Sequence, residues 1–135
     1  MQFAVYAIKR EVTEHYYYKV DILKRFFEEC SDFPHSHIYK QQLDYITNHF
    51  SFLDWLKKIH SSHSNLNSQL FDCLRNYDIL EDKKCCCLFQ CDSLWQAERV
   101  LFQPLRMCDQ SFFIVEESGE HYGWISPFIR QRLLS

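Results

Sequence analysis

Glycine is almost absent from this chain of 135 residues, which holds only Gly119 and Gly123. Phosphate-binding loops need several glycines in one short segment, because the backbone must approach the phosphates closely. The chain cannot build such a loop, so we do not expect nucleotide chemistry. The chain also holds only three prolines and no repeat or low-complexity segment, so we expect no interdomain linker and one domain spanning residues 1–135.

An excess of positive charge is also lacking: 15 Lys and Arg stand against 18 Asp and Glu, which gives a net charge of -3 with histidine neutral. A DNA-binding regulator, which needs basic side chains for the phosphate backbone, is therefore disfavoured. No apolar run reaches the roughly 18 residues of a membrane span, and residues 1–10 do not resemble a signal peptide. We predict a cytoplasmic protein that binds neither membranes nor nucleic acid directly.

Hydrophobic residues are abundant, at 47% of the chain, and aromatic residues reach 17%, which is typical of a globular domain with an aromatic core. The seven cysteines are an odd number, and Cys85, Cys86 and Cys87 are consecutive. Such a set does not resemble a disulfide framework, so we expect reduced thiols.

Apolar runs and helical periodicity alternate along the chain, which predicts an α+β fold with a mixed or antiparallel sheet. Residues 2–9 are apolar on both faces, as expected of a strand covered on each side. Residues 84–91 form a short apolar run and predict a central strand. Residues 112–116 and 120–125 flank Ser118-Gly119, which predicts a C-terminal β-hairpin with a two-residue turn and a positive φ at Gly119.

Helices are predicted where apolar residues recur every three or four positions. The first spans about residues 13–30, and the second carries Tyr39, Leu43, Ile46 and Phe50 with Ser36 as its N-cap. A third begins at Asp92 or Ser93, and Pro104 limits its length. Residues 52–60 fit either a strand or a helix, and residues 61–69 are polar enough for a loop.

Two chemical sites can be considered and are not favoured. The histidine pairs His35/His37 and His60/His63 accompany many cysteines, but the cysteines supply no second pair at zinc-finger spacing, so we expect no metal and no cofactor. A thiol-dependent hydrolase or transferase would use Cys108 or Cys30 as nucleophile, with His121 or His15 as base. Nothing near these cysteines marks an activated thiol, so an enzyme using Cys108 and His121 is retained only as the alternative.

Surface aromatic residues are the remaining feature. Tyr16, Tyr17 and Tyr18 are consecutive, so on a helix they point in directions about 100° apart and at least one must be exposed. Tyr45 lies one position off the apolar stripe of its helix, beside Gln42. Such rings either shield the edge of the core or serve as anchors for a protein partner.

Three segments resemble, in the same order, the SirA-like inhibitors of replication from spore-forming Firmicutes. They are YAIKREVTEHYYY at 6–18, KQQLDYIT at 40–47 and FFIVEESGEHYGWISP at 112–127, and together they cover about half of the chain. The block Tyr122-Gly123-Trp124, followed by Pro127, is the most specific part. The resemblance does not extend to residues 50–83.

The resemblance implies a non-enzymatic inhibitor of replication initiation that binds the N-terminal domain (domain I) of the initiator DnaA during sporulation. Carried over by position, the contact residues are Val12, Tyr16, Gln42, Tyr45 and Pro127. At Val12 the family has phenylalanine, so this anchor is smaller here. The block Tyr122-Gly123-Trp124 is expected to be structural, with Tyr122 and Trp124 packing on one face of a strand and Gly123 permitting a close backbone approach.

Overall fold

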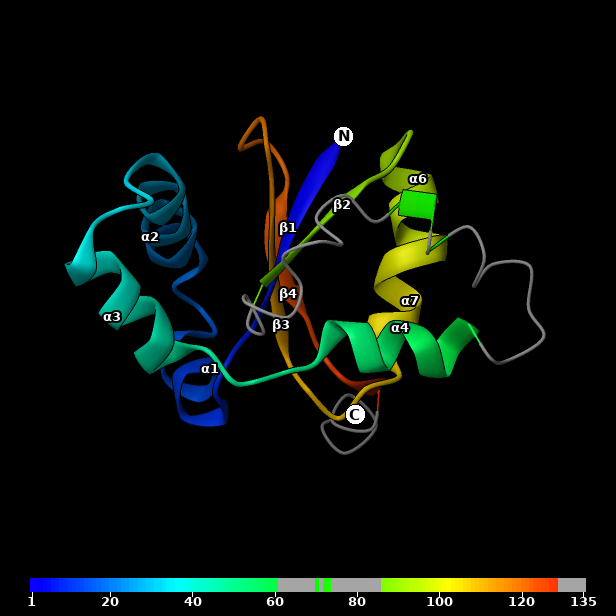
Figure 1. Cartoon of the computed structure of the whole chain (residues 1–135), viewed down its shortest axis with the longest axis horizontal. Helices are drawn as coiled ribbons and strands as arrows, with labels where there is room; N and C mark the ends of the chain where they lie inside the picture. Colours follow the sequence, from blue (N-terminus) through cyan, green and yellow to red (C-terminus); the bar gives the residue numbers. More distant parts are fainter. Residues whose placement is uncertain (61–69, 71, 74–85, 129–135) are drawn as a thin grey trace.

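The computed structural model describes residues 1–60, 70, 72–73 and 86–128. Its strands form an antiparallel sheet in the order β2-β1-β3-β4 (Figure 1). The strands are β1 (Gln2–Ala7), β2 (Cys86–Gln90), β3 (Phe112–Glu116) and β4 (Tyr122–Ile125). The helices are α1 (Arg10–Tyr16), α2 (Val20–Asp32), α3 (His37–Ile46), α4 (Phe52–His60), α6 (Leu94–Ala97), the π-helical segment η2 (Glu98–Phe102) and α7 (Gln103–Arg106). The expected α+β class is confirmed.

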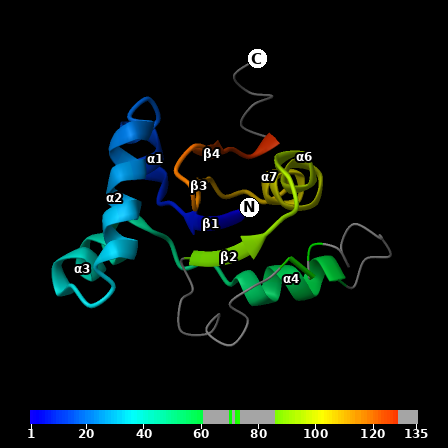
Figure 2. The same cartoon turned by 90° about the horizontal axis from the view of Figure 1, so that it is seen from above.

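Helices cover the sheet on both faces, so the fold has three layers (Figures 1 and 2). Side chains alternate along a strand, and β1 therefore serves two cores. Phe3 and Val5 face the layer of α4, α6, η2 and α7, whereas Tyr6 and Ile8 face the layer of α1, α2 and α3. The expectation that the first strand is covered on each side is confirmed.

The core beneath α1, α2 and α3 is built around Phe27. This side chain is only 1% exposed, stacks on Tyr6 at 4.0 Å between ring centroids, and contacts Phe113 at 5.5 Å. Leu23, one turn earlier on α2, is buried in the same cluster. Phe27 therefore attaches α2 to two strands of the sheet at once.

The residues expected to form one helix over 13–30 form two, so this prediction is wrong. Lys19 has φ -112° and ψ 47°, outside the helical region, and it separates α1 from α2. The indole Nε1–H of Trp124 donates to the Tyr17 carbonyl at 2.9 Å, an oxygen that a continuous helix would use internally. A contact with the last strand thus replaces a helical hydrogen bond, which no local pattern in 13–30 reveals.

Two strand predictions also change. β2 lies at one end of the described sheet order and not at its centre, and its apolar character reflects burial of Cys87 and Phe89 on one face. The hairpin loop has four residues, since Glu116 N–H donates to the His121 carbonyl at 2.8 Å. Gly119 does adopt the expected positive φ, at 80°.

The starts of α3 and α6 coincide with serine N-caps. Ser36 accepts a hydrogen bond from the Tyr39 N–H, and Ser93 accepts one from the Gln96 N–H, so both expected N-caps are confirmed. Residues 52–60 are helical, which settles the ambiguity there, whereas the loop expected at 61–69 lies outside the described residues. Phe50 lies beyond the end of α3 and packs on Phe112 in the other core, so it is not part of the α3 stripe.

Pro104 does not end its helix, which continues to Arg106. Proline lacks an N–H, and its ring clashes with the carbonyl four residues earlier, here that of Val100. Val100 lies in the π-helical segment η2, where the wider turn accommodates the proline.

Glu116 is a buried carboxylate that closes the hairpin loop. It accepts hydrogen bonds from the Ser118 N–H and from the Ser118 hydroxyl, the latter at 2.7 Å. Burial by itself raises the pKa of this carboxyl, but the Ser118 hydrogen bonds, His121 and the N-terminal ammonium together bring the pKa below its usual value. The ionised form is therefore favoured in the folded protein.

The lowered pKa predicts a contribution to acid sensitivity. A carboxyl whose pKa is lower in the folded state stabilises the protein above its unfolded pKa, about 4.3 for glutamate, and this stabilisation is lost as the pH falls through the folded pKa. Denaturant titrations at a series of pH values should show a shallower acid loss of unfolding free energy for Glu116→Gln than for the wild type. Parallel pH curves for the two proteins would contradict the role of this carboxylate.

Candidate functional site

Lys9 connects the two helices that carry the predicted contact residues. Its backbone N–H donates to the Ile46 carbonyl at the end of α3, at 3.0 Å. Its carbonyl accepts hydrogen bonds from the Thr13 N–H at 2.9 Å and the Thr13 hydroxyl at 3.1 Å, in the first turn of α1. The start of α1 is therefore fixed against the end of α3.

The block Tyr122-Gly123-Trp124 holds the turn between α1 and α2. Trp124 stacks on Tyr17, with ring centroids 6.0 Å apart and planes 9° from parallel, and packs edge-on against Phe113 at 5.1 Å. Tyr122 donates its hydroxyl to Asp21 of α2 at 2.6 Å. The structural interpretation of Tyr122 and Trp124 is thus confirmed: Trp124 positions the end of α1, and Tyr122 positions the start of α2.

Gly123 serves a different purpose from the one expected. A Cβ at this position would meet no atom within 4 Å, so a close backbone approach does not explain the glycine. Its φ of 152° is a conformation that residues with a side chain rarely adopt. The backbone angle, and not lack of space, accounts for glycine between Tyr122 and Trp124.

An exposed face of α3 carries two of the predicted contact residues. Tyr45 is 74% exposed, Ile38 is 67% exposed, and Gln42 is also exposed. Positions three and four apart are neighbours on a helix, so the three side chains form one stripe. The Lys9 ammonium lies over the Tyr45 ring, 5.2 Å from its centroid.

Tyr16 lies at the last residue of α1 and is 38% exposed. The Lys19 ammonium lies over its ring at 5.3 Å, the same arrangement as Lys9 over Tyr45. Tyr18 is 93% exposed, which confirms that the three consecutive tyrosines cannot all be covered. Val12 is half-buried and packs against the core that also holds Ile46.

The structure brings four of the predicted contact residues into one helical layer. α1 supplies Val12 and Tyr16, and α3 supplies Gln42 and Tyr45. Pro127, in contrast, is buried after the last strand, so it can support the fold but offers little surface to a partner. The sequence did not reveal Lys9 and Lys19 as parts of this surface, because their positions over the rings depend on how α1, α2 and α3 pack.

The alternative pair Cys108 and His121 does not form a catalytic site. The two residues flank β3 at opposite ends, and a five-residue strand spans about 17 Å. Burial raises the pKa of the Cys108 thiol to about 11, against the lowering effect of Lys58 and Trp55. Burial and Glu29 likewise raise the pKa of Cys30 to about 11. Activated thiols have lowered pKa values, so neither cysteine resembles a nucleophile.

The described residues offer no metal, disulfide or membrane-spanning site. Among them, no group of three or more His, Cys, Asp and Glu side chains is arranged to hold a metal ion. His63 and Cys85, both considered as ligands, lie outside the described residues. The six cysteines that the structure describes form no disulfide with one another. None of the helices within the described ranges has the length and hydrophobicity needed to cross a membrane.

Comparison with models of protein families finds a match for this chain. A family model described as "Sporulation inhibitor of replication protein SirA" matches residues 1–129, and so spans all of the elements described above. No curated protein matches the chain.

Proposed function

The chain belongs to the SirA family of sporulation inhibitors of replication, and from that premise we propose that it inhibits initiation by binding the N-terminal domain of DnaA. The proposed contact surface consists of Val12, Tyr16, Gln42 and Tyr45, and is called the α1/α3 surface below. The inhibitor acts in the cytoplasm without a catalytic step or a cofactor.

The observation that carries this proposal is the exposure of Tyr45 beside Gln42 on a helix whose end is fixed by hydrogen bonds. Tyrosine offers a flat apolar face and a hydroxyl at a modest cost in side-chain entropy, and glutamine can both donate and accept hydrogen bonds. Anchors of this kind are common at the centres of protein interfaces. The backbone contacts of Lys9 hold α1 and α3 together, so little rearrangement is needed on binding.

Inhibition would be steric. A protein seated on the N-terminal domain of DnaA denies that surface to other factors and to self-association, which lowers the amount of initiator that can assemble at the origin. No bond is made or broken in this mechanism, so its strength depends only on affinity and concentration.

A calorimetric titration of the chain with the purified N-terminal domain of DnaA tests the proposal. We expect saturable binding that Trp95→Ala leaves unchanged, because Trp95 is exposed on the opposite helical layer. Failure of the wild-type chain to bind the domain would refute the proposed partner. Loss of binding in Trp95→Ala would place the contact on the layer of α4, α6, η2 and α7, and not on the α1/α3 surface.

Lys9 provides a subtler prediction. Its ammonium covers one face of Tyr45 and should restrict the ring to the orientation that a partner meets. Cation-π contacts of exposed residues contribute about 0.5–1 kcal/mol, so Lys9→Gln should weaken binding about two- to five-fold. The backbone hydrogen bonds of residue 9 remain in this variant, and its unfolding transition should be close to wild type. An unchanged dissociation constant would show that the lysine does not orient Tyr45 for binding.

A further inference from the structure

α3 is attached to the rest of the molecule along one side. Of its ten residues, all of which the structure describes, none is fully buried. The half-buried ones are Tyr39, Leu43 and Ile46, at a spacing of four and then three, and they form the inner stripe of the helix. Leu43 and Ile46 pack against the core that holds Phe27. The remaining sides of α3 are exposed.

The two flanks beside the inner stripe differ in charge. At 100° per residue, Lys40 and Asp44 lie on one flank, and Ile38, Gln42 and Tyr45 lie on the other. Lys40 and Asp44 are the charged side chains of α3, with histidine neutral. The flank of Ile38, Gln42 and Tyr45 therefore carries no charged residue of α3, and is called the uncharged flank below.

Ile38 is a large apolar side chain on the uncharged flank, and it is 67% exposed. Seven positions separate it from Tyr45, or about 10 Å along the helix axis, with Gln42 between them. Helices that dock into a groove of another protein present their anchors at such spacings, i, i+4 and i+7. The uncharged flank therefore has the arrangement of a docking helix.

The first turn of α3, which carries Ile38, is fixed by its neighbours. Ser36 caps the helix by accepting a hydrogen bond from the Tyr39 N–H at 3.3 Å. The Tyr39 hydroxyl donates to Glu29 of α2 at 2.9 Å, and its ring stacks on Phe33, with centroids 5.9 Å apart and planes 12° from parallel. Ile38 lies between two residues that are held in place, so a partner meets it with little loss of conformational freedom.

We infer that Ile38 is a further contact residue of the α1/α3 surface and inserts into an apolar pocket on the partner. This inference rests on the proposed function, because it takes the N-terminal domain of DnaA as that partner. The contact then runs along α3 from Tyr45 through Gln42 to Ile38. Lys9 lies over the ring at the Tyr45 end, and Ile38 supplies apolar area at the other end.

Continuity with the α1/α3 surface identifies the occupant. A specific interface buries about 800 Å² on each partner and involves about 20 residues a side, which is more than four side chains supply. The contact must therefore extend beyond those four residues. Ile38 and Tyr45 are the strongly exposed large apolar side chains of α3, and Gln42 is one turn from both. The partner that covers Gln42 and Tyr45 is thus the one that reaches Ile38.

Calorimetric titration of the full chain with the purified N-terminal domain of DnaA tests the inference. Ile38→Ala should weaken binding about five- to tenfold and should make the heat-capacity change of binding less negative, because less apolar surface is buried. Alanine is a better helix former than isoleucine, so a weaker α3 would not explain this loss. Ile38→Leu keeps the apolar volume and should bind within about threefold of the wild type.

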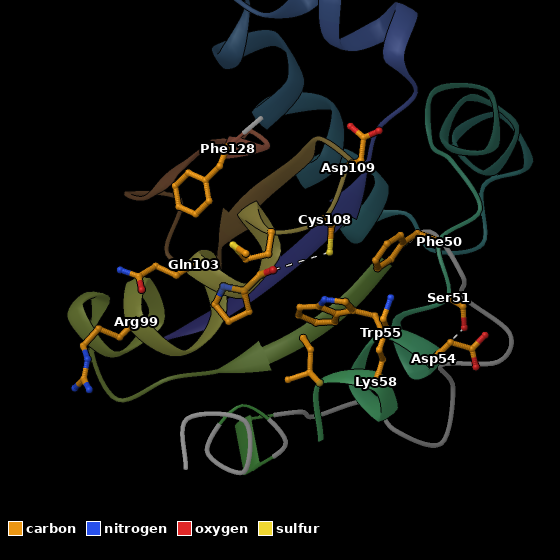
Figure 3. A pocket seen from close by; sticks show the side chains of 13 residues that line it. Phe50, Ser51, Asp54, Trp55, Lys58, Arg99, Gln103, Cys108, Asp109 and Phe128 are labelled. Atoms are coloured by element: carbon orange, nitrogen blue, oxygen red, sulfur yellow. Dashed lines mark hydrogen bonds between the residues drawn. The ribbon is translucent and has the colours of Figure 1, made fainter. Parts of the chain in front are cut away.

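Two variants serve as matched controls. Lys40→Ala removes an exposed side chain from the other flank of α3. Met107→Ala removes an apolar side chain that is 75% exposed and lines a groove between α4, η2 and α7, on the opposite helical layer (Figure 3). Both variants should bind as the wild type does.

The outcomes separate this inference from the proposed function. Wild-type binding that Tyr45→Ala weakens and Ile38→Ala leaves unchanged overturns the inference and leaves the DnaA contact in place. An equal loss in Lys40→Ala or in Met107→Ala also overturns it, since the partner would then cover the charged flank or the groove. Failure of the wild type to bind refutes the proposed partner, and the role of Ile38 with it.

Discussion

Replacing Phe27 with alanine should lower the free energy of unfolding by about 3–5 kcal/mol. The ring is 1% exposed and lies between Tyr6 of β1 and Phe113 of β3, so its removal leaves a cavity in the core beneath α2. The surrounding rings are fixed by the sheet and can fill that cavity only in part. Denaturant unfolding followed by circular dichroism measures the loss.

Ile22→Ala is the matched control, since Ile22 lies on the same helix but is 57% exposed. It should cost less than about 1 kcal/mol, as is usual for surface substitutions. Similar losses for the two variants would mean that Phe27 does not anchor α2. Because α2 contacts α3, the Phe27 variant should also weaken binding to the N-terminal domain of DnaA, even under conditions where it stays folded.

Local signals in the sequence predict much of this fold. Ser36 and Ser93 mark helix starts because a side-chain oxygen there accepts an otherwise unsatisfied N–H, which depends on neighbouring residues alone. The apolar first strand and the glycine in the hairpin are likewise local features. The division of residues 13–30 into two helices depends on the hydrogen bond from Trp124 to the Tyr17 carbonyl. These two residues are 107 positions apart, so the helical periodicity of 13–30 cannot predict the contact.

For the candidate site, local signals in the sequence predict exposure but not a binding role. The position of Tyr45 off the apolar stripe of its helix predicts a side chain at the rim of the core, and Tyr45 is 74% exposed, whereas its role as a contact residue is implied only by the resemblance. Pro127 was carried over by resemblance alone, and burial after the last strand was not visible in the sequence. The positions of Lys9 over Tyr45 and of Lys19 over Tyr16 depend on how the helices pack against each other. No short spacing in the sequence predicts that packing.

The most specific motif of the chain connects the fold to the site. Trp124 closes the turn after α1, and Tyr122 binds the start of α2, so the last strand determines where Tyr16 is presented. The block Tyr122-Gly123-Trp124 would therefore contribute indirectly to the binding proposed for the α1/α3 surface.

Removal of the tyrosine anchors should have the largest effect on binding. Tyr45→Ala should weaken binding to the N-terminal domain of DnaA by on the order of 2 kcal/mol, or about 30-fold, because the ring is 74% exposed beside Gln42 and is proposed as a central aromatic anchor. Tyr16→Ala should cost a similar amount. Neither side chain belongs to a buried core, so the unfolding transitions of both variants should stay near wild type.

Tyr18→Ala is the control, because Tyr18 is the most exposed of these tyrosines at 93% and is not among the proposed contacts. It should bind as the wild type does. Retention of full affinity by both Tyr45→Ala and Tyr16→Ala would exclude the α1/α3 surface.

The double variant carries further information. Tyr45 lies near the start of α1 and Tyr16 at its end, about 10 Å along the helix axis. At that separation the two losses should add, to about 4 kcal/mol, if the partner contacts each ring independently. A clearly smaller combined loss would mean that one partner element bridges both rings, so that removing either ring already releases the other.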